Sequence, residues 1–170
     1  MTEKRKNLLR ELQNYYEAYC ADIRREAAAL RSEPMPELTE ELFSLFEKNG
    51  NRLIYEEVYF KRRKRLAVLG LKAILDGKRE DFSELERVLL AVCDEECWAL
   101  PAHVRRLADG KWKIFVDLFV AETAQTLAEL ISVLGEALSE KGRERVKEEV
   151  LRRAQARFHV ETLHGQYLFI

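Results

Sequence analysis

Apolar side chains recur at alternating spacings of three and four residues along most of this 170-residue chain, a pattern that predicts successive amphipathic helices. The first stripe predicts a helix from about Glu3 to Arg31, which Pro34 and Pro36 end because proline removes a backbone donor. The later stripes predict helices over residues 37–48, 54–75, 81–95, 117–134 and 139–158. Since most connections are short, successive helices should pack antiparallel. The pattern therefore predicts an all-α fold of antiparallel helical hairpins.

One segment lacks this helical period. Residues 104–116 contain Asp109-Gly110, a turn signal, and their flanks fit either a short β-hairpin or a loop. Both interpretations stay open at this point. Asp117 follows directly and is expected to cap the next helix, because its short carboxylate accepts from the first backbone amides.

Composition narrows the class of protein. The chain is 47% hydrophobic and 35% charged, a balance typical of a folded domain. Because 29 Lys and Arg nearly cancel 30 Asp and Glu, no global field attracts nucleic acid or an anionic membrane. No uninterrupted apolar run approaches ~18 residues, so no transmembrane helix is predicted. Three cysteines are an odd number, which favours a reducing compartment, and we expect a cytoplasmic protein.

The last residues suggest that the chain is a piece of a longer protein. Tyr167-Leu168-Phe169-Ile170 ends it on apolar side chains, whereas chain ends are more often polar and loosely held. We therefore expect a single helical domain over residues 1–170, cut from a longer polypeptide. Its parts would be an N-terminal helix (1–31), helical hairpins (37–158) and a truncated tail (159–170).

The turn from Trp98 to His103 is the first candidate site. An indole can stack on the apolar face of a sugar while an imidazole exchanges protons or hydrogen bonds. The competing interpretation is that Trp98 plugs the junction between two helices and His103 bonds a carbonyl group. Residue pattern alone favours this second interpretation.

Glu122 and Arg62 are the other candidate site residues. Glu122 follows a very apolar helix start, where partial desolvation would raise the pKa of a carboxyl group, but it also fits the solvent side of its helix. Arg62 shares the apolar stripe of its helix, so it is expected to be a paired core arginine or an anion contact in a cavity. The basic run Lys61–Arg65 spreads around all sides of a helix, so nucleic-acid binding is disfavoured. Farther on, Arg152 and Arg153 are expected on a solvated helix face.

No metal or cofactor site is predicted. Cys93 and Cys97 are one helical turn apart and lack the spacing and further ligands of a zinc site, so two half-buried thiols are expected. Nucleotide-binding loops and hydrolase or metalloprotease motifs are absent from the sequence. No catalytic set can be assembled from this chain alone.

Three segments together resemble heparinase II/III-like proteins. Glu57–Ala67 (EVYFKRRKRLA) is similar to the aromatic-then-basic helix start of that family. Trp98–His103 (WALPAH) and Asp117–Ala124 (DLFVAETA) look like the next two landmarks of its N-terminal helical region, in the same order and at fitting spacings. The resemblance covers about Tyr55–Phe158.

The resemblance implies an incomplete α/α toroid followed by further domains of the same chain, in a polysaccharide lyase that cleaves uronic-acid glycans by β-elimination. In that family an Asn-His pair, a Tyr and another His, all later in the chain, carry the elimination. No matching pattern is present here, so this chain alone is expected to be inactive. Trp98, His103, Glu122 and Arg62 are expected to line the cleft for an acidic polysaccharide or oligosaccharide. The alternative is a non-catalytic helical protein-interaction module.

Overall fold

The computed structural model describes residues 3–107, 112–114 and 116–155, and within them the chain is predominantly helical. This confirms the all-α class that the apolar periodicity predicts. In chain order the α-helices are α1 (Glu3–Tyr15), α2 (Glu17–Ser32), α3 (Glu40–Asn49), α4 (Leu53–Asp76), α5 (Arg79–Cys93), α6 (Leu118–Leu134) and α7 (Glu140–Gln155). The chain also contains two short 3-10 turns among the described residues. Pro101–His103 precedes the first β-strand, and Gly135–Ala137 follows α6.

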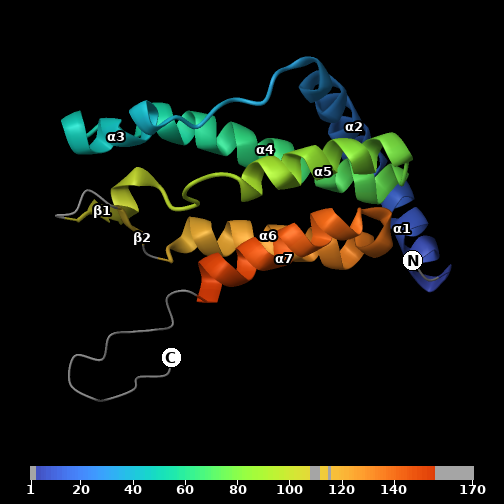
Figure 1. The fold of residues 1–170 in the computed structure, drawn as a ribbon. Helices are drawn as coiled ribbons and strands as arrows, with labels where there is room; N and C mark the ends of the chain where they lie inside the picture. The colour runs from blue at the N-terminus through green and yellow to red at the C-terminus, as the bar shows by residue number, and fades with distance from the viewer. Residues whose placement is uncertain (1–2, 108–111, 115, 156–170) are drawn as a thin grey trace.

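Two helical hairpins form the body of the molecule. One pairs α4 with α5 and the other pairs α6 with α7, and Figure 1 shows the second hairpin below the first. Across the hairpins, α4 lies beside α6 and α5 beside α7, so the helices form two layers. The fold is therefore a stack of hairpins, in which corresponding helices run parallel (Figure 1).

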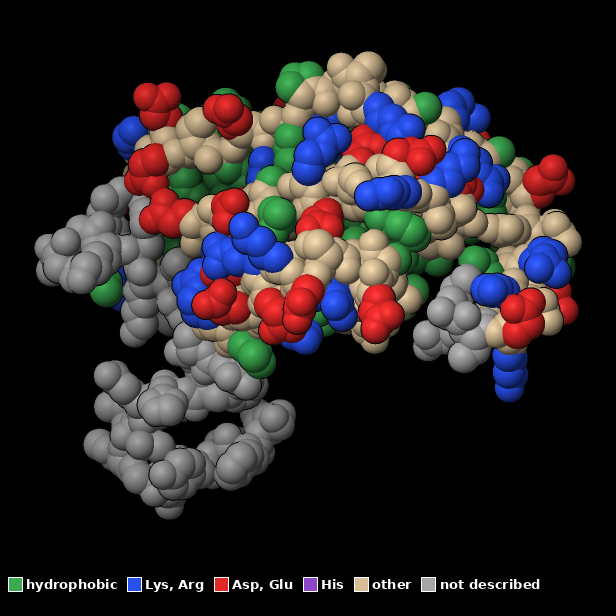
Figure 2. Space-filling model, turned by 45° about the vertical axis from the view of Figure 1, so that its right-hand side comes forward, with side chains coloured by type: hydrophobic (Ala, Val, Ile, Leu, Met, Phe, Trp, Pro, Cys, Tyr) green, Lys and Arg blue, Asp and Glu red, His purple; other side chains and the backbone are tan. Residues whose placement is uncertain are grey.

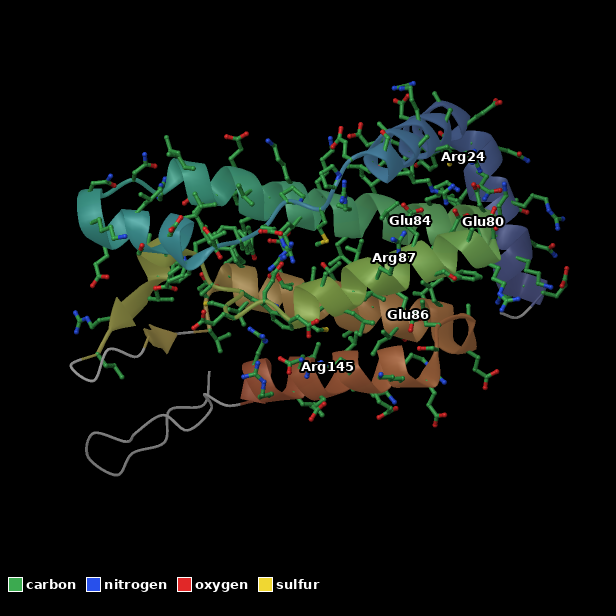
Figure 3. All side chains as sticks on the ribbon, turned by 45° about the horizontal axis from the view of Figure 1, so that its top comes forward. Arg24, Glu80, Glu84, Glu86, Arg87 and Arg145 are labelled. Atoms are coloured by element: carbon green, nitrogen blue, oxygen red, sulfur yellow. The ribbon has the colours of Figure 1, made fainter. Side chains whose placement is uncertain are left out.

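Helix α5 is held on both sides by polar contacts as well as by its apolar stripe. Glu84 accepts from Arg31 of α2 at 2.5 Å, and Glu86 accepts from the Ser139 backbone amide, just before α7, at 3.1 Å. Figure 3 shows Glu84 and Glu86 on different sides of α5. Leu85 and Leu89 lie between these two sides and are at most 1% exposed. The core therefore lies between the two layers, and charged pairs close its margins.

The predicted N-terminal helix is interrupted, which corrects the expectation of one helix over residues 1–31. Tyr16 has φ −112° and ψ 38°, outside the helical region, and separates α1 from α2. Helix α2 packs along α4 and buries Ile23 and Ala27. Helix α1 lies at the end of the bundle, where Gln13 donates to the Leu75 carbonyl at 2.7 Å (Figure 1). The apolar stripe is continuous in sequence, but only its second half has a helix to pack against.

Other helix ends differ from the sequence predictions by a few residues. Helix α3 begins at Glu40 rather than at residue 37, because Thr39 caps it by accepting from the Leu42 amide at 3.3 Å. Helix α5 begins at Arg79, before the predicted start at Asp81, whose side chain is buried and bound by Lys72 at 2.9 Å. The first residue of α3 is thus decided by a capping contact, and the first residue of α5 by a contact with another helix.

The segment that the sequence left open forms a β-hairpin. Strand β1 (Val104–Arg106) pairs antiparallel with β2 (Trp112–Ile114), with Val104 opposite Ile114. Asp109-Gly110 lies outside the described residues, as do residues 156–158 of the last predicted helix and the predicted tail 159–170. Asp117 caps α6 as predicted, since its Oδ1 accepts from the Val120 amide at 2.8 Å.

Within the described residues, the stretch Leu118–Ala137 is long and apolar enough to cross a membrane by length and composition. This stretch contains no long uninterrupted apolar run, because Glu122 and Glu129 interrupt it, and no transmembrane helix was therefore predicted there. Only 28% of its most apolar window is buried in the protein. Since a core helix passes the same test, the finding does not assign a location.

Candidate functional site

Trp98 is buried, contrary to its predicted role as a sugar-stacking residue. Its side chain is 1% exposed, and its indole Nε1 donates to the Val92 carbonyl at 2.8 Å. The Arg153 guanidinium lies 4.5 Å from the ring centroid, in cation–π geometry. No ring face is open to a ligand, because the turn after α5 wraps back onto the helix end. The competing interpretation of the sequence, a plug between helices, describes the structure.

His103 has the opposite environment. Its side chain is 43% exposed, and its Nδ1 lies 2.6 Å from Asp117 Oδ2. Asp117 is held in turn by the start of α6, so the same carboxylate caps a helix and orients an imidazole. A carboxylate only accepts, so Nδ1 carries the hydrogen in this pair. Nε2 is then the nitrogen available to accept from a hydroxyl when the ring is neutral, or to donate when it is charged.

An aromatic ring packs on this imidazole, and exposed apolar side chains lie next to that ring. The His103 ring stacks on Phe119, with centroids 6.0 Å apart and planes at 22°. Phe119 meets Phe60 of α4 at 5.7 Å, and Phe60 is 44% exposed. Leu118 is 72% exposed at the start of α6. These five residues, His103, Asp117, Leu118, Phe119 and Phe60, are called the His103 edge below.

Glu122 lies one turn beyond Leu118, on the solvent side of α6. This exposed position is the one that the sequence pattern favours, and Gln125 and Glu129 share that side, joined by a 2.9 Å hydrogen bond. Glu122 also lines a small cavity of about 100 Å³ with Phe60 and Thr126. It can therefore contact a ligand at the His103 edge, but its carboxylate has no desolvated environment.

Arg62 is a paired core arginine and not an open anion contact. Its Nε donates to Glu95 at 2.6 Å, and its two other nitrogens donate to the carbonyls of Pro36 and Ala91 at 2.6 and 2.8 Å. The side chain is 9% exposed. Of the two kinds of site predicted for Arg62, the structure forms the first, because all three nitrogens already have acceptors.

The neighbouring arginine completes this internal pairing. Arg63 donates to both oxygens of Glu95, at 2.9 and 2.6 Å, and to Thr123 Oγ1 at 3.0 Å. Burial opposes its charge, but the Glu95 hydrogen bonds outweigh burial and keep the Arg63 pKa above its ordinary value. Lys61 pairs with Glu57 at 2.7 Å on the exposed side. The basic run therefore forms no common basic face, as the helical spacing predicts.

Tyr59 connects this charged group to the turn. Its hydroxyl donates to the Trp98 carbonyl at 3.0 Å and lies 3.2 Å from Thr123 Oγ1. Buried contacts from α4 and α6 thus hold the backbone of the turn. His103 is positioned by this rigid base, five residues beyond Trp98.

Arg153 also serves the turn, although the sequence analysis expected a solvated helix face for it. It donates to the carbonyls of Cys93, Glu95 and Glu96, and its side chain is 11% exposed. Its partner Glu149 is 4% exposed. The sequence did not predict that Arg153 and Glu149 point inward, because charged residues occur on all faces of α7.

The thiols near the turn are not arranged for metal binding. Cys93 and Cys97 are buried and unpaired, and burial raises the pKa of each to about 11. Across residues 3–107, 112–114 and 116–155, no cluster of three or more His, Cys, Asp or Glu side chains could hold a metal ion.

Sequence reasoning found His103 and Asp117 separately but missed their pairing, as well as Phe60 and Phe119. The aromatic pair at Tyr59-Phe60 and the acid-aromatic start of α6 were visible signals. Nothing in either segment alone shows that they meet, because Phe60 and Phe119 are far apart in sequence.

Comparison with known proteins returns no match, neither to a protein-family model, nor to a curated protein, nor to a solved structure.

Proposed function

We propose that this chain is the N-terminal helical scaffold of a heparinase II/III-like polysaccharide lyase and supplies part of its glycan cleft at the His103 edge. The observation that supports the scaffold is the side-by-side stacking of α4 with α6 and of α5 with α7. An up-and-down bundle closes on itself, whereas stacked hairpins leave a flank to which further hairpins can be added. A partial α/α toroid has this arrangement.

The His103 edge has the groups that recognise a sugar. Phe60 and Leu118 offer apolar surface to the C–H face of a pyranose ring, and His103 Nε2 offers a hydrogen bond at its rim. When the imidazole is charged, it also attracts a uronate carboxylate. The proposed substrate class, an acidic polysaccharide or oligosaccharide, rests on this combination and on the family resemblance.

The same edge is insufficient for β-elimination. Elimination needs a base for the proton beside the uronate carboxylate, a group that neutralises that carboxylate and an acid for the leaving oxygen. Among the described residues, the His103 edge supplies one imidazole and one carboxylate that is already bound. In this proposal the remaining groups come from following domains, and the 170-residue chain binds glycan without cleaving it.

Calorimetric titration of the 170-residue chain with heparin-derived and alginate tetrasaccharides tests this function. We expect binding that His103→Gln weakens roughly tenfold, the effect of losing one hydrogen bond to a charged group. Maltotetraose, which is neutral, and Glu11→Gln, an exposed carboxylate on α1, serve as controls. Absorbance of the unsaturated product should stay flat with every glycan.

Two results would contradict the proposal: no binding of either uronate tetrasaccharide, or binding that His103→Gln and Phe60→Ala leave unchanged. Absence of glycan binding would favour the non-catalytic interaction module. That alternative has one structural feature in its support, the apolar side chains that α1 and the start of α2 leave in solvent, namely Leu8, Leu12, Tyr15, Tyr16 and Tyr19.

A further inference from the structure

A second cavity lies at the α3 end of the molecule. Its volume is about 420 Å³, within the range of small-molecule sites. It is lined by residues 37–39, by α3, α4 and the end of α5, and by the residues that follow α5. Its lining includes one guanidinium and five carboxylates: Arg62, Glu37, Glu40, Asp94, Glu95 and Glu96. Figure 2 shows acidic side chains gathered over this end of the molecule.

The guanidinium does not neutralise the rim of this cavity. The nitrogens of Arg62 are used by Glu95 and by two backbone carbonyls, and Glu95 is shared with Arg63. Glu37 and Glu96 are exposed, and their carboxylates have no hydrogen bond or ion pair within the described part of the chain. These two carboxylates, of one sign, concentrate oppositely charged ions at the mouth of the cavity.

Tyr55 provides a separate indication of a ligand. It is 3% exposed and lines the cavity, yet its hydroxyl makes no hydrogen bond to any residue that the structure describes. Because this hydroxyl lines the cavity and has no partner among the described residues, a donor bound in the cavity can bond it. Burial raises the pKa of this phenol, which keeps the hydroxyl neutral and able to accept from a cation.

The walls select among cations. Phe43 meets Tyr55 edge-to-face at 5.2 Å, and Leu38, Ala91 and Cys97 add apolar surface to the lining. Apolar surface of this kind suits an alkyl chain, and aromatic rings attract ammonium groups. A hard divalent cation instead needs several converging oxygens. No metal-binding group of three or more side chains is present among the residues described.

We propose that this cavity binds a small organic cation, an alkyl chain with ammonium groups at its ends. One ammonium group bonds the Tyr55 hydroxyl in the cavity, and another lies between the carboxylates of Glu37 and Glu96 at the rim. The site takes the charge opposite to that of a uronate glycan, so it is independent of the function proposed for the His103 edge.

Calorimetric titration of the 170-residue chain with spermidine, at constant ionic strength, tests the site. We expect one binding site that the double variant Glu37→Gln/Glu96→Gln weakens about tenfold and Tyr55→Phe weakens several-fold, the latter by losing a hydrogen bond while keeping its ring. Glu11→Gln removes an exposed carboxylate from α1, at the other end of the molecule, and should leave affinity unchanged (Figure 1). Circular dichroism verifies that each variant is folded.

Three outcomes would overturn the proposal. Spermidine does not bind; all variants, including Glu11→Gln, weaken binding equally, as for diffuse attraction to an acidic surface; or equimolar magnesium chloride displaces spermidine, as for a metal site. Retention of full affinity by folded Tyr55→Phe would remove the hydroxyl from the site and likewise count against it.

Discussion

At the scale of single residues, side-chain type did not determine role. Trp98 and His103 are five positions apart in one turn, yet one is buried beneath Arg153 and the other is exposed beside Phe119. The difference follows from the contacts that hold the turn. Val92 offers a carbonyl to the indole inside the molecule, whereas Asp117 holds the imidazole at its surface.

Substitution of Trp98 should therefore affect stability and not glycan binding. Trp98→Ala removes a fully buried ring, so we expect the free energy of unfolding in urea to fall by about 3–5 kcal/mol. Trp98→Phe keeps an aromatic ring but leaves the Val92 carbonyl without its donor, at a cost of about 1–3 kcal/mol. Unfolding is followed by circular dichroism, and tetrasaccharide affinity is measured on Trp98→Phe. A stable Trp98→Phe protein that has lost glycan affinity would show that the indole contacts ligand.

At the scale of elements, local sequence signals placed most helix ends within a few residues. Gly50, Gly77 and Gly135 end α3, α4 and α6, and all three have positive φ. Asp117 caps α6 as its position predicts. The Tyr16 break was not foreseen, because the apolar stripe passes through it and only packing against α4 distinguishes α2 from α1.

Two of these glycines make different demands on the backbone, and this predicts a difference between equivalent variants. Gly77 has φ 63° and ψ 25°, a left-handed conformation that asparagine tolerates, whereas Gly135 has φ 53° and ψ −126°. Neither has any atom within 4 Å of an added Cβ, so backbone strain alone separates them. We expect Gly135→Asn to lower the free energy of unfolding by about 1–3 kcal/mol.

Gly77→Asn is the matched control and should cost less than about 1 kcal/mol. Both variants are compared by urea unfolding with unchanged m-values. Equal losses in the two proteins would mean that the turn between α6 and α7 relaxes freely, and that Gly135 does not set the geometry of this hairpin.

At the scale of the whole molecule, buried charged groups join the two hairpins. Glu149 of α7 accepts from Arg145, Arg152 and Arg153, and Arg153 reaches the turn that follows α5. Burial alone would raise the Glu149 pKa, but the hydrogen bonds from Arg152 and Arg153 outweigh burial and lower it from 4.5 to about 2. The stability of the stacked hairpins therefore depends on the ionisation of the Glu149 carboxyl group.

Acid should weaken this coupling in a defined window. Because the folded-state pKa lies below the unfolded value, the stabilisation by Glu149 is complete above pH 4.5 and is lost as the pH falls toward 2. We expect Glu149→Gln to lower the free energy of unfolding at pH 7 by about 3 kcal/mol. Its deficit relative to the unsubstituted chain should shrink between pH 4.5 and pH 2.

Urea unfolding at several pH values measures this difference. Glu148→Gln is the control, because Glu148 is next in the chain but 72% exposed, and it should stay within about 0.5 kcal/mol of the unsubstituted chain. A deficit of Glu149→Gln that does not vary with pH would show that its effect is steric and not electrostatic.

The amino-acid sequence was sufficient for the class of fold, the hairpin order and most helix boundaries. Each depends on residues within one or two helical turns of one another, as with the apolar stripes and the cap at Asp117. Burial of Trp98, Arg62 and Glu149, and the meeting of His103 with Phe119 and Phe60, depend instead on groups brought together from different elements. Side-chain type alone leaves more than one face of each helix able to lie in the core. The packing of the hairpins against one another decides which face is buried.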